Sequence, residues 1–330
     1  MRNFPYHSSD NAAIITADKI NSLVIDPSNN TSRDPNGSHL NCPLNKSFFH
    51  DIPFPISRTV YFDQFLDIQC DYINPNDLDD SILGVNSNDL IIFHNNIRSL
   101  KKNFCKVQNE LFWNCSDYPD ILAFSETRIN DVSCIPCLEG YSFEHKDSPN
   151  AIGGVGVYVS NKMNYTIRNE YHLEISGCEN LWLEIDLKND KTNKRCNSIV
   201  LGVIYRHPGS KYETFCEKLC NQLLIFNEKK IKYTIVGDFN IDLNQYNVAS
   251  NVTNYLNAIS SSGCNVFIDK PTRITSNGGS CIDHVYSNFP SNQLKNYILQ
   301  GDISDHFGTL TRVENIILKD NNPINYYHTS

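Results

Sequence analysis

The pattern of hydrophobic and polar positions divides the chain near residue 88. Residues 1–87 carry short apolar clusters with no sustained helical or strand period, among many Asn, Ser, Asp and Pro residues. Such a composition buries too little apolar surface to offset the entropy lost on ordering. We therefore expect a mostly disordered extension over residues 1–87, with one short helix near residues 62–71. A partner-binding segment is the functional alternative.

Between residues 88 and 318 the apolar positions follow the periods of strands and helices. Strands are expected over residues 90–94, 120–124, 141–145, 153–159, 181–187, 197–205, 233–236, 265–268, 281–287, 297–299 and 307–313. Helices are expected over residues 101–115, 211–227 and 252–261. Mixed hairpin and helical connections predict an α/β (α+β) fold, a four-layer sandwich of two stacked, mostly antiparallel β-sheets flanked by helices. Residues 319–330 are expected to form a loose C-terminal tail.

Charge and cysteine content limit the function classes. The net charge of the 330 residues is −9, and most of the acidic excess lies in the predicted extension, so the remainder has no basic stripe typical of a dedicated nucleic-acid surface. The 12 cysteines are irregularly spaced, which favours reduced thiols over a disulfide framework or a zinc site. We find neither a signal peptide nor a long apolar run. We therefore expect a nuclear or cytoplasmic protein that is not secreted and does not enter a membrane.

The end of one expected strand carries two polar side chains that can converge. Asp238 and Asn240 follow the apolar residues 233–236, and residues two apart in an extended chain point to the same side. Other strand ends or adjacent turns carry acids, amides, a Tyr-Arg pair and one His, namely Asn96, Glu126, Tyr205 with Arg206, Asp283, and Asp305 with His306. A lone Asp at such a place is usually a turn residue or a helix cap, a lone Tyr usually packs, and the segment Asn96-Ile97-Arg98-Ser99 alone is usually a turn. Their repetition where strands stop predicts one shared site.

Carboxylates, amides and one His suit the hydrolysis of a phosphate ester with a hard divalent cation. Mg²⁺, with Mn²⁺ as an alternative, takes oxygen ligands and needs only one or two carboxylates. An Asp held by an Asn can orient or deprotonate the attacking water. A protonated His paired with an Asp can neutralise the charge that grows on the phosphate oxygens. The sequence contains no GxSxG elbow, no GxxxxGKS loop and no GxGxxG turn after a strand, which are motifs of other chemistries.

Six motifs in this order resemble the motif series of the endonuclease/exonuclease/phosphatase family. They are Asn96-Ile97-Arg98-Ser99-Leu100, Phe124-Ser125-Glu126-Thr127, Tyr205-Arg206-His207-Pro208, Gly237-Asp238-Phe239-Asn240, Ile282-Asp283-His284 and Ser304-Asp305-His306. Together with Pro271-Thr272-Arg273-Ile274-Thr275, they look most like the apurinic-like endonuclease domain of LINE-type non-LTR retrotransposons. The resemblance implies a Mg²⁺-dependent DNA endonuclease that nicks one strand and leaves 3′-hydroxyl and 5′-phosphate ends.

The resemblance also implies a role for each residue at the expected site. The residues near the metal would be Glu126, as the main ligand, Asn96 and Asp305. The catalytic residues would be Asp238 at the attacking water, Asn240 and Tyr205 at the phosphate, and His306 at the scissile phosphate, oriented by Asp283. The residues that bind substrate would be Arg206 and Arg273.

Two departures and two alternatives accompany the resemblance. Abasic-site repair relatives carry an acid two residues after the first Asn, where this chain has Arg98, which fits the retrotransposon branch. No reverse transcriptase sequence follows, so a fragment, a degenerate copy and a domesticated endonuclease are all open. The alternatives are another phosphodiesterase of this fold, acting on RNA tails, lipids or inositol phosphates, and a non-catalytic DNA-binding relic. We expect a monomer whose DNA binding is strongly salt-sensitive.

Overall fold

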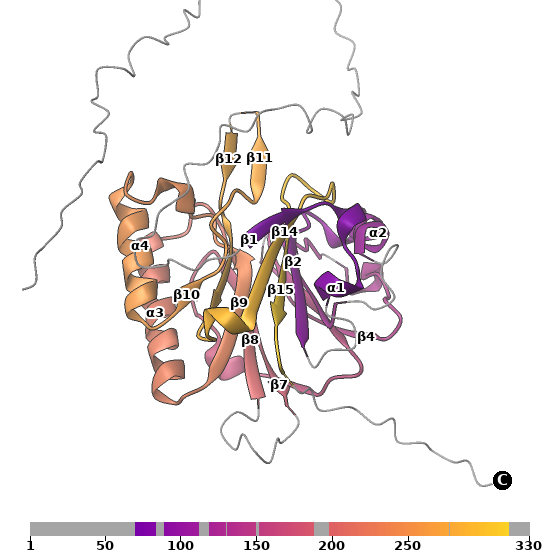
Figure 1. Ribbon diagram of the computed structural model, residues 1–330, viewed down its shortest axis with the longest axis horizontal. Helices are drawn as coiled ribbons and strands as arrows, with labels where there is room; N and C mark the ends of the chain where they lie inside the picture. The colour runs from indigo at the N-terminus through magenta and orange to yellow at the C-terminus, as the bar shows by residue number, and fades with distance from the viewer. Residues whose placement is uncertain are drawn as a thin grey trace, which may run out of the picture. The chain divides into compact units, whose positions relative to one another are not determined.

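Two stacked β-sheets flanked by helices form the centre of the protein (Figure 1). The computed structural model describes residues 70–83, 89–111, 119–129, 131–149, 152–187, 198–276 and 278–316. Within these residues, no helix has the length and apolar character of a membrane span. The cysteines whose side chains the structure describes are free thiols, as their spacing predicted.

The described strands belong to one large sheet, one smaller sheet and a separate hairpin. The larger sheet contains β1 (Cys70–Ile73), β2 (Leu90–Asn96), β3 (Ile121–Ser125), β4 (Tyr141–Lys146), β5 (Val155–Ser160), β14 (Leu294–Leu299) and β15 (Gly308–Val313). The smaller sheet contains β6 (Tyr165–Ile167), β7 (Cys178–Asp186), β8 (Ser198–Arg206), β9 (Lys232–Asp238), β10 (Asn265–Val266) and β13 (Asp283–Ser287). The hairpin consists of β11 (Arg273–Thr275) and β12 (Gly278–Ser280).

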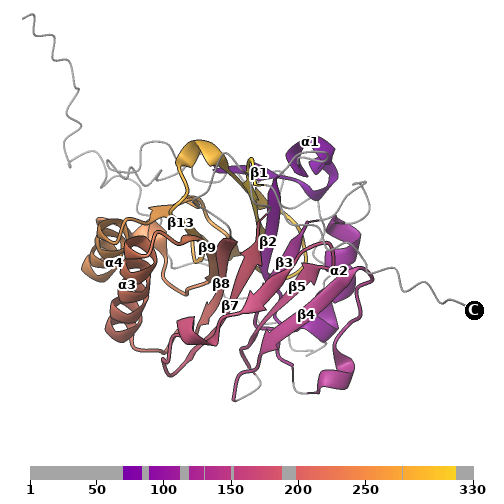
Figure 2. The same ribbon diagram turned by 90° about the horizontal axis from the view of Figure 1, so that it is seen from below.

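The α-helices of the described residues are α1 (Asp80–Leu83), α2 (Leu100–Leu111), α3 (Tyr212–Glu228) and α4 (Ser250–Ser261). Short 3-10 turns lie at Pro75–Asp77, Val132–Cys134, Asn169–Tyr171, Leu243–Gln245 and Ser291–Gln293. Figure 2 shows α3 and α4 beside the smaller sheet and α2 beside the larger one, which gives the order helix, sheet, sheet, helix. This arrangement confirms the predicted α/β sandwich.

Strand order explains how distant motifs reach one place. The larger sheet runs β1-β14-β15-β2-β3-β5-β4, and the smaller sheet runs β10-β13-β9-β8-β7-β6. Three neighbouring pairs are parallel, β1 with β14, β2 with β3, and β8 with β9, and the other pairs within the two sheets are antiparallel. The parallel pair β2–β3 in one sheet and the parallel pair β8–β9 in the other bring four of the predicted strand ends together.

Both faces of the central strands are buried, and alternation decides which residues face the other sheet. In β2, Leu90 and Ile92 belong to the core between the sheets, whereas Ile91 and Phe93 pack with the residues of α2. Successive side chains of a strand point to opposite faces. The face of Leu90 and Ile92 therefore continues to Asn96, which points into the space between the sheets.

Most predicted strands and helices agree with the structure to within a few residues, but the boundary of the extension is wrong. We expected the extension to run to residue 87, yet β1 pairs in parallel with β14 and so belongs to the larger sheet. Of the helix expected near residues 62–71, residues 62–69 lie outside the described residues, and Cys70 and Asp71 form part of a strand. A pairing between segments so distant in sequence leaves no local pattern. The short elements α1 and β6 were not predicted, and residues 1–69 and 317–330 lie outside the described part.

Candidate active site

Asn96 joins two acids that come from different sheets. Its amide nitrogen donates to Asp238 Oδ2 at 2.7 Å and to Glu126 Oε1 at 3.0 Å. Asn96 ends β2, Asp238 ends β9, and Glu126 follows β3. All three are buried. An ionised carboxylate accepts hydrogen bonds but cannot donate them, so two such groups need a donor between them, and the Asn96 amide supplies it.

Glu126 lies in a turn directly after β3, and its carboxylate reaches Asn96 at the end of β2 and Tyr205 near the end of β8. Its backbone has a φ of 50°, which is rare for a residue with a side chain. Arg128 forms an ion pair with its Oε2, and the Tyr205 hydroxyl donates to its Oε1 at 3.3 Å. Burial alone would raise the pKa of Glu126, but the hydrogen bond from Asn96 and the arginine hold that pKa below its usual value. Glu126 is therefore an ionised, partly shielded oxygen donor at neutral pH.

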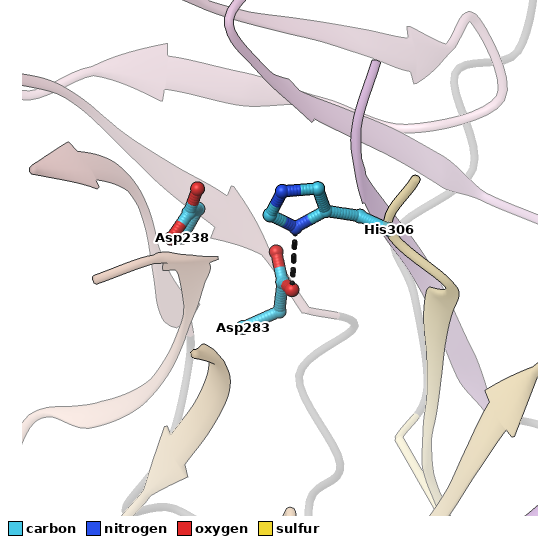
Figure 3. Close-up of side chains that lie close together, drawn as sticks. All are labelled: Asp238, Asp283 and His306. Atoms are coloured by element: carbon cyan, nitrogen blue, oxygen red, sulfur yellow. Dashed lines mark hydrogen bonds and ion pairs between the residues drawn. The ribbon is translucent and has the colours of Figure 1, made fainter. Parts of the chain in front are cut away.

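A second group is the buried triad of Asp238, Asp283 and His306, drawn in Figure 3. The Asn96 amide connects it to Glu126, because it donates to both Asp238 and Glu126. Asp238 and Asp283 are register partners on the antiparallel strands β9 and β13. His306 Nδ1 lies 2.9 Å from Asp283 Oδ2, and one ligand atom from each of the three residues falls within 4.8 Å of the others. The triad thus brings two carboxylates and one imidazole close together, with the imidazole hydrogen-bonded to Asp283.

Burial and mutual charge set the protonation of the triad. Burial, and then the like charge of Asp283, raise the pKa of Asp238 to about 7. Burial opposes a charged imidazole, but contact with Asp283 raises the pKa of His306 to about 9. Burial also opposes the charge on Asp283, yet the neighbouring His306 lowers the pKa of that carboxyl. At neutral pH the triad therefore holds an imidazolium against Asp283, with Asp238 close to its own titration point.

Thr272 contacts the triad through Asp283, and this role was not predicted from the sequence. Its hydroxyl donates to Asp283 Oδ2 at 2.6 Å, the oxygen that also contacts His306. The other oxygen of Asp283, Oδ1, is buried and has no hydrogen-bond partner among the described residues. In the sequence, the motif that contains Thr272 points only to the family and, through Arg273, to substrate contact. Only the fold places this hydroxyl against the carboxylate.

Asp305 lies at the opening of the site and pairs with Arg98 and Arg273. Together with Arg128, which pairs with Glu126, these two arginines form what we call the arginine rim. Arg98 Nη1 contacts both carboxylate oxygens of Asp305, at 2.8 and 2.9 Å, and Arg273 Nε lies 3.0 Å from one of them. Arg98 Nε also lies 3.8 Å from Glu126 Oε2. Burial opposes the charge of Asp305, but His306 and the two arginines keep its pKa below the usual value. Asp305 is therefore near Glu126, with Arg98 reaching both.

The structure does not bring the Arg206 guanidinium to the site. Tyr205 and Arg206 are consecutive in β8, so they point to opposite faces of the sheet. The guanidinium donates to the backbone carbonyls of Phe239, Asn240 and Ser210 and lies over the rings of Tyr212 and Phe215. The prediction that Arg206 binds substrate is wrong for this reason. Alternation of the strand was a signal in the sequence that could have shown it.

Asn240 supports Asp238 through its backbone. Its N–H donates to Asp238 Oδ1 at 2.9 Å, and its side-chain amide donates to the Arg206 carbonyl at 2.7 Å. Its φ of 49° turns the chain directly after β9. Both oxygens of Asp238 are thus fixed, one by Asn96 and one by Asn240. Whether the Asn240 side chain also reaches a phosphate stays a prediction.

A basic pocket adjoins this site. Its volume is about 540 Å³, and it includes Arg98 and Arg128, the two arginines nearest Glu126. The other lining residues are Lys102, Asn103, Lys106, Ile303 and Ser304. Four basic side chains around one opening favour an anionic ligand. This pocket was not predicted from the sequence, because a chain of net negative charge can still carry a local basic surface.

The fold and these residues define the class of the protein. The sequence model of the endonuclease/exonuclease/phosphatase family matches residues 94–306. The chain belongs to this family, whose members are generally nucleases and other phosphodiesterases that depend on divalent metal. No curated protein sequence matches the chain.

Two solved structures illustrate the shared fold. The endonuclease domain of TRAS1, a telomere-specific non-LTR retrotransposon, is 12% identical, with a TM-score of 0.50, over 68% of this chain and 98% of its own. The catalytic domain of Xenopus laevis APE2 is 16% identical, with a TM-score of 0.51, over 70% of this chain and 94% of its own. At these identities the similarity demonstrates a common fold.

Proposed function

We propose that the protein hydrolyses phosphodiester bonds in DNA with the help of Mg²⁺ or Mn²⁺ and nicks one strand. The observation that carries this proposal is the position of the buried triad beside Glu126. An ionised oxygen donor, an acid with a pKa near 7 and an imidazolium lie within one small polar space. These are the groups needed to hold a metal, activate a water and bind a phosphate.

The donor set near Glu126 fits a hard divalent cation better than the triad does. Glu126 and the Asn96 carbonyl offer oxygen atoms, which are the ligands that Mg²⁺ prefers. Imidazole binds a metal only in its neutral form, and the pKa of His306 is about 9. Glu126 and Asn96 would therefore hold the ion, with Asp305 close enough to contribute. When bound, a divalent ion supplies Lewis-acid polarisation of a phosphate oxygen.

Asp238 is the residue best placed to handle the attacking water. Its two oxygens are fixed by Asn96 and by the N–H of Asn240, so its orientation is set before substrate arrives. A general base is most efficient when its pKa is close to the working pH, and the pKa of Asp238 is about 7. Asp238 would orient a water in line with the scissile bond and accept its proton.

His306 would bind the phosphate under attack. Its Nδ1 is committed to Asp283, so the Nε2–H is the donor available to a phosphate oxygen. Its positive charge would offset the negative charge that grows on that oxygen. Tyr205 could add a hydroxyl contact from the Glu126 side. The role of each residue in this scheme is part of the proposal.

DNA is the substrate that the surroundings favour. The basic pocket beside Glu126 suits a phosphate of a nucleic-acid strand. Arg273 on the β11–β12 hairpin pairs with Asp305 at the opening of the site. A phosphate of the DNA would replace Asp305 as the partner of this guanidinium. The motif resemblance to LINE-type endonucleases supports a retrotransposon-derived nicking enzyme over an abasic-site repair enzyme.

The test is cleavage by the purified full chain with Mg²⁺ on four substrates in parallel. Supercoiled plasmid, a duplex with one abasic site, poly(A) RNA and a phospholipid vesicle separate the substrate classes. Asp238→Ala and His306→Ala serve as controls. We expect the plasmid to become nicked circles with 3′-hydroxyl ends. Preference for RNA or lipid would contradict the DNA assignment, and wild-type rates no higher than those of both variants on every substrate would refute the catalytic role.

A further inference from the structure

Strand β1 adds an element beyond the part of the chain that matches the family. The family match begins at residue 94, whereas β1 covers Cys70–Ile73 and lies at one edge of the larger sheet. Figure 1 shows β1 crossing beside β14, near the base of the β11–β12 hairpin. β1 pairs with β14, but its side chain Tyr72 also contacts Pro271 and Phe307, which lie outside β14 and next to site residues in the chain.

Tyr72 of β1 makes two contacts of this kind. Its hydroxyl donates to the carbonyl oxygen of Pro271 at 2.9 Å. Its ring packs edge-on against Phe307, with ring centroids 6.4 Å apart and an interplanar angle of 80°. Pro271 directly precedes Thr272, and Phe307 directly follows His306. Tyr72 thus contacts the neighbour of Thr272, which donates to Asp283, and the neighbour of His306.

Lys270 strengthens the connection between β1 and the same segment. Its ammonium group donates to the carbonyl of Cys70, lies 3.4 Å from a carboxylate oxygen of Asp71, and lies 5.8 Å from the centre of the Tyr72 ring. Lys270 and Pro271 are therefore both attached to β1. These contacts join segments that lie far apart in the chain.

The residues that follow, Thr272 and Arg273, hold the site. The Thr272 hydroxyl donates to Asp283 Oδ2 at 2.6 Å, and Arg273 lies 3.0 Å from Asp305. The carbonyl of Thr272 also accepts the N–H of Phe307 at 2.7 Å, and Arg273 forms an isolated β-bridge with His306. Residues 270–273 thus contact β1 through their first half and the catalytic carboxylates through their second half.

We propose that Tyr72 is a positioning residue, which holds residues 270–273 so that Thr272 and His306 meet Asp283 in the geometry needed for phosphate hydrolysis. The inference rests on the proposed function for its effect on rate. Tyr72 touches neither Asp283 nor His306, so it acts only through Pro271 and Phe307. Small displacements of a catalytic pair reduce the rate far more than they reduce substrate binding.

The chain offers a closely matched control at the opposite edge of the same sheet. Tyr141 lies on β4, the other edge strand, and its hydroxyl donates to the carbonyl of Pro119 at 2.6 Å. Tyr72→Phe and Tyr141→Phe therefore each remove one hydroxyl that donates to a proline carbonyl from an edge strand. Both variants keep the aromatic ring, so both should fold and lose similar stability.

The experiment compares the two full-length variants in two measurements. The first is plasmid nicking with Mg²⁺, analysed for kcat and KM separately. We expect Tyr72→Phe to lower kcat about threefold to tenfold with KM nearly unchanged, from the loss of one ordering hydrogen bond. Tyr141→Phe should keep the wild-type kcat at the same shift in Tm.

The second measurement is the NMR signal of the His306 imidazole in the protein without substrate or metal. The signal should move or broaden in Tyr72→Phe and stay in place in Tyr141→Phe. That result supports the inference even if the wild-type chain nicks no DNA, in which case only the proposed function fails. An unchanged His306 signal together with a wild-type kcat in Tyr72→Phe would overturn the inference, as would equal effects from both variants.

Discussion

The buried triad and the arginine rim both contain ion pairs but differ in their contact with water. Asp283, Asp238 and His306 are at most 2% exposed, whereas the side chains of Arg98 and Arg128 are 39% and 34% exposed. In the triad, charges face each other in a medium that strengthens every electrostatic interaction. At the rim, water screens each ion pair and makes it weak.

This difference suggests a division of labour between the two regions. The triad is fixed in advance by Asn96, Asn240 and Thr272, so it can orient a water and a phosphate without rearranging. The rim arginines pair with Glu126 and Asp305 through contacts that an incoming cation or phosphate could replace. We therefore expect substitutions in the triad to reduce kcat and substitutions at the rim to change the requirement for metal and DNA.

A large effect that separates the two regions is expected from His306→Gln. Loss of the imidazolium should lower kcat by about 10²–10³ because the donor that offsets phosphate charge is gone. Single-turnover plasmid nicking at saturating enzyme would measure this. A kcat within fivefold of wild type would contradict the role given to the triad.

The same substitution has a pH signature in stability. A raised pKa of about 9 means that folding favours the protonated ring of His306. This contribution is complete below the usual His pKa and is lost as the pH rises through about 9. The difference in unfolding free energy between wild type and His306→Gln should therefore be largest near pH 6 and shrink toward pH 9. Urea unfolding at several pH values would check the sign.

Glu126→Gln should affect the metal more than the DNA. The uncharged amide keeps the shape of Glu126 but is a poor ligand for Mg²⁺, so we expect roughly a 10²-fold loss of activity that higher Mg²⁺ partly restores. A Mg²⁺ titration of the nicking rate provides the measurement. Glu184→Gln is the matched control, because Glu184 pairs with Arg168 toward the opposite end of β8. Equal Mg²⁺ requirements for wild type and Glu126→Gln would place the metal elsewhere.

Two neighbouring residues of β8 should separate activity from stability. Tyr205→Phe removes a hydroxyl from Glu126, and we expect a loss in kcat of about tenfold with little change in Tm. Arg206→Met leaves buried carbonyls without donors, and we expect a loss of about 1–3 kcal/mol in unfolding free energy with nearly normal kcat per folded molecule. The reverse outcome, with activity lost only in Arg206→Met, would contradict the orientation of β8.

The smallest change concerns the pKa of one ring. Asp283→Asn should lower the pKa of His306 from about 9 toward the usual value for His, because its opposite charge is removed. An NMR titration of the imidazole protons would follow it. His284, whose pKa burial lowers to about 4, should stay neutral near pH 7 before and after the substitution and provides an internal reference.

Much of the site could be predicted because strand alternation is a local property. The sequence placed Asn96, Asp238 and Asp283 at strand ends, and the structure brings all three between the sheets. The same rule, applied to Tyr205 and Arg206, would have shown that only one of them can face the site. That error came from carrying a motif over as a unit.

The remainder depends on contacts that no local pattern encodes. β1 pairs with a strand near the other end of the described chain, and the β11–β12 hairpin separates Thr272 from Asp283 in the sequence although the two side chains touch. Arg98 and Arg128 lie in turns with positive φ, and their pairing with Glu126 depends on how two separate loops meet. The basic pocket also depends on how these two loops pack together, so the net charge of the chain did not predict it.

The most direct test of the central claim is the nicking rate of full-length Asp238→Asn against that of wild type with Mg²⁺. This substitution keeps the shape of Asp238 while it removes the base and the repulsion with Asp283. The account predicts a loss of about 10²–10⁴ in kcat, together with unchanged DNA binding and a Tm that is equal or higher. A variant that nicks plasmid within tenfold of wild type would contradict the assignment of the attacking water to Asp238.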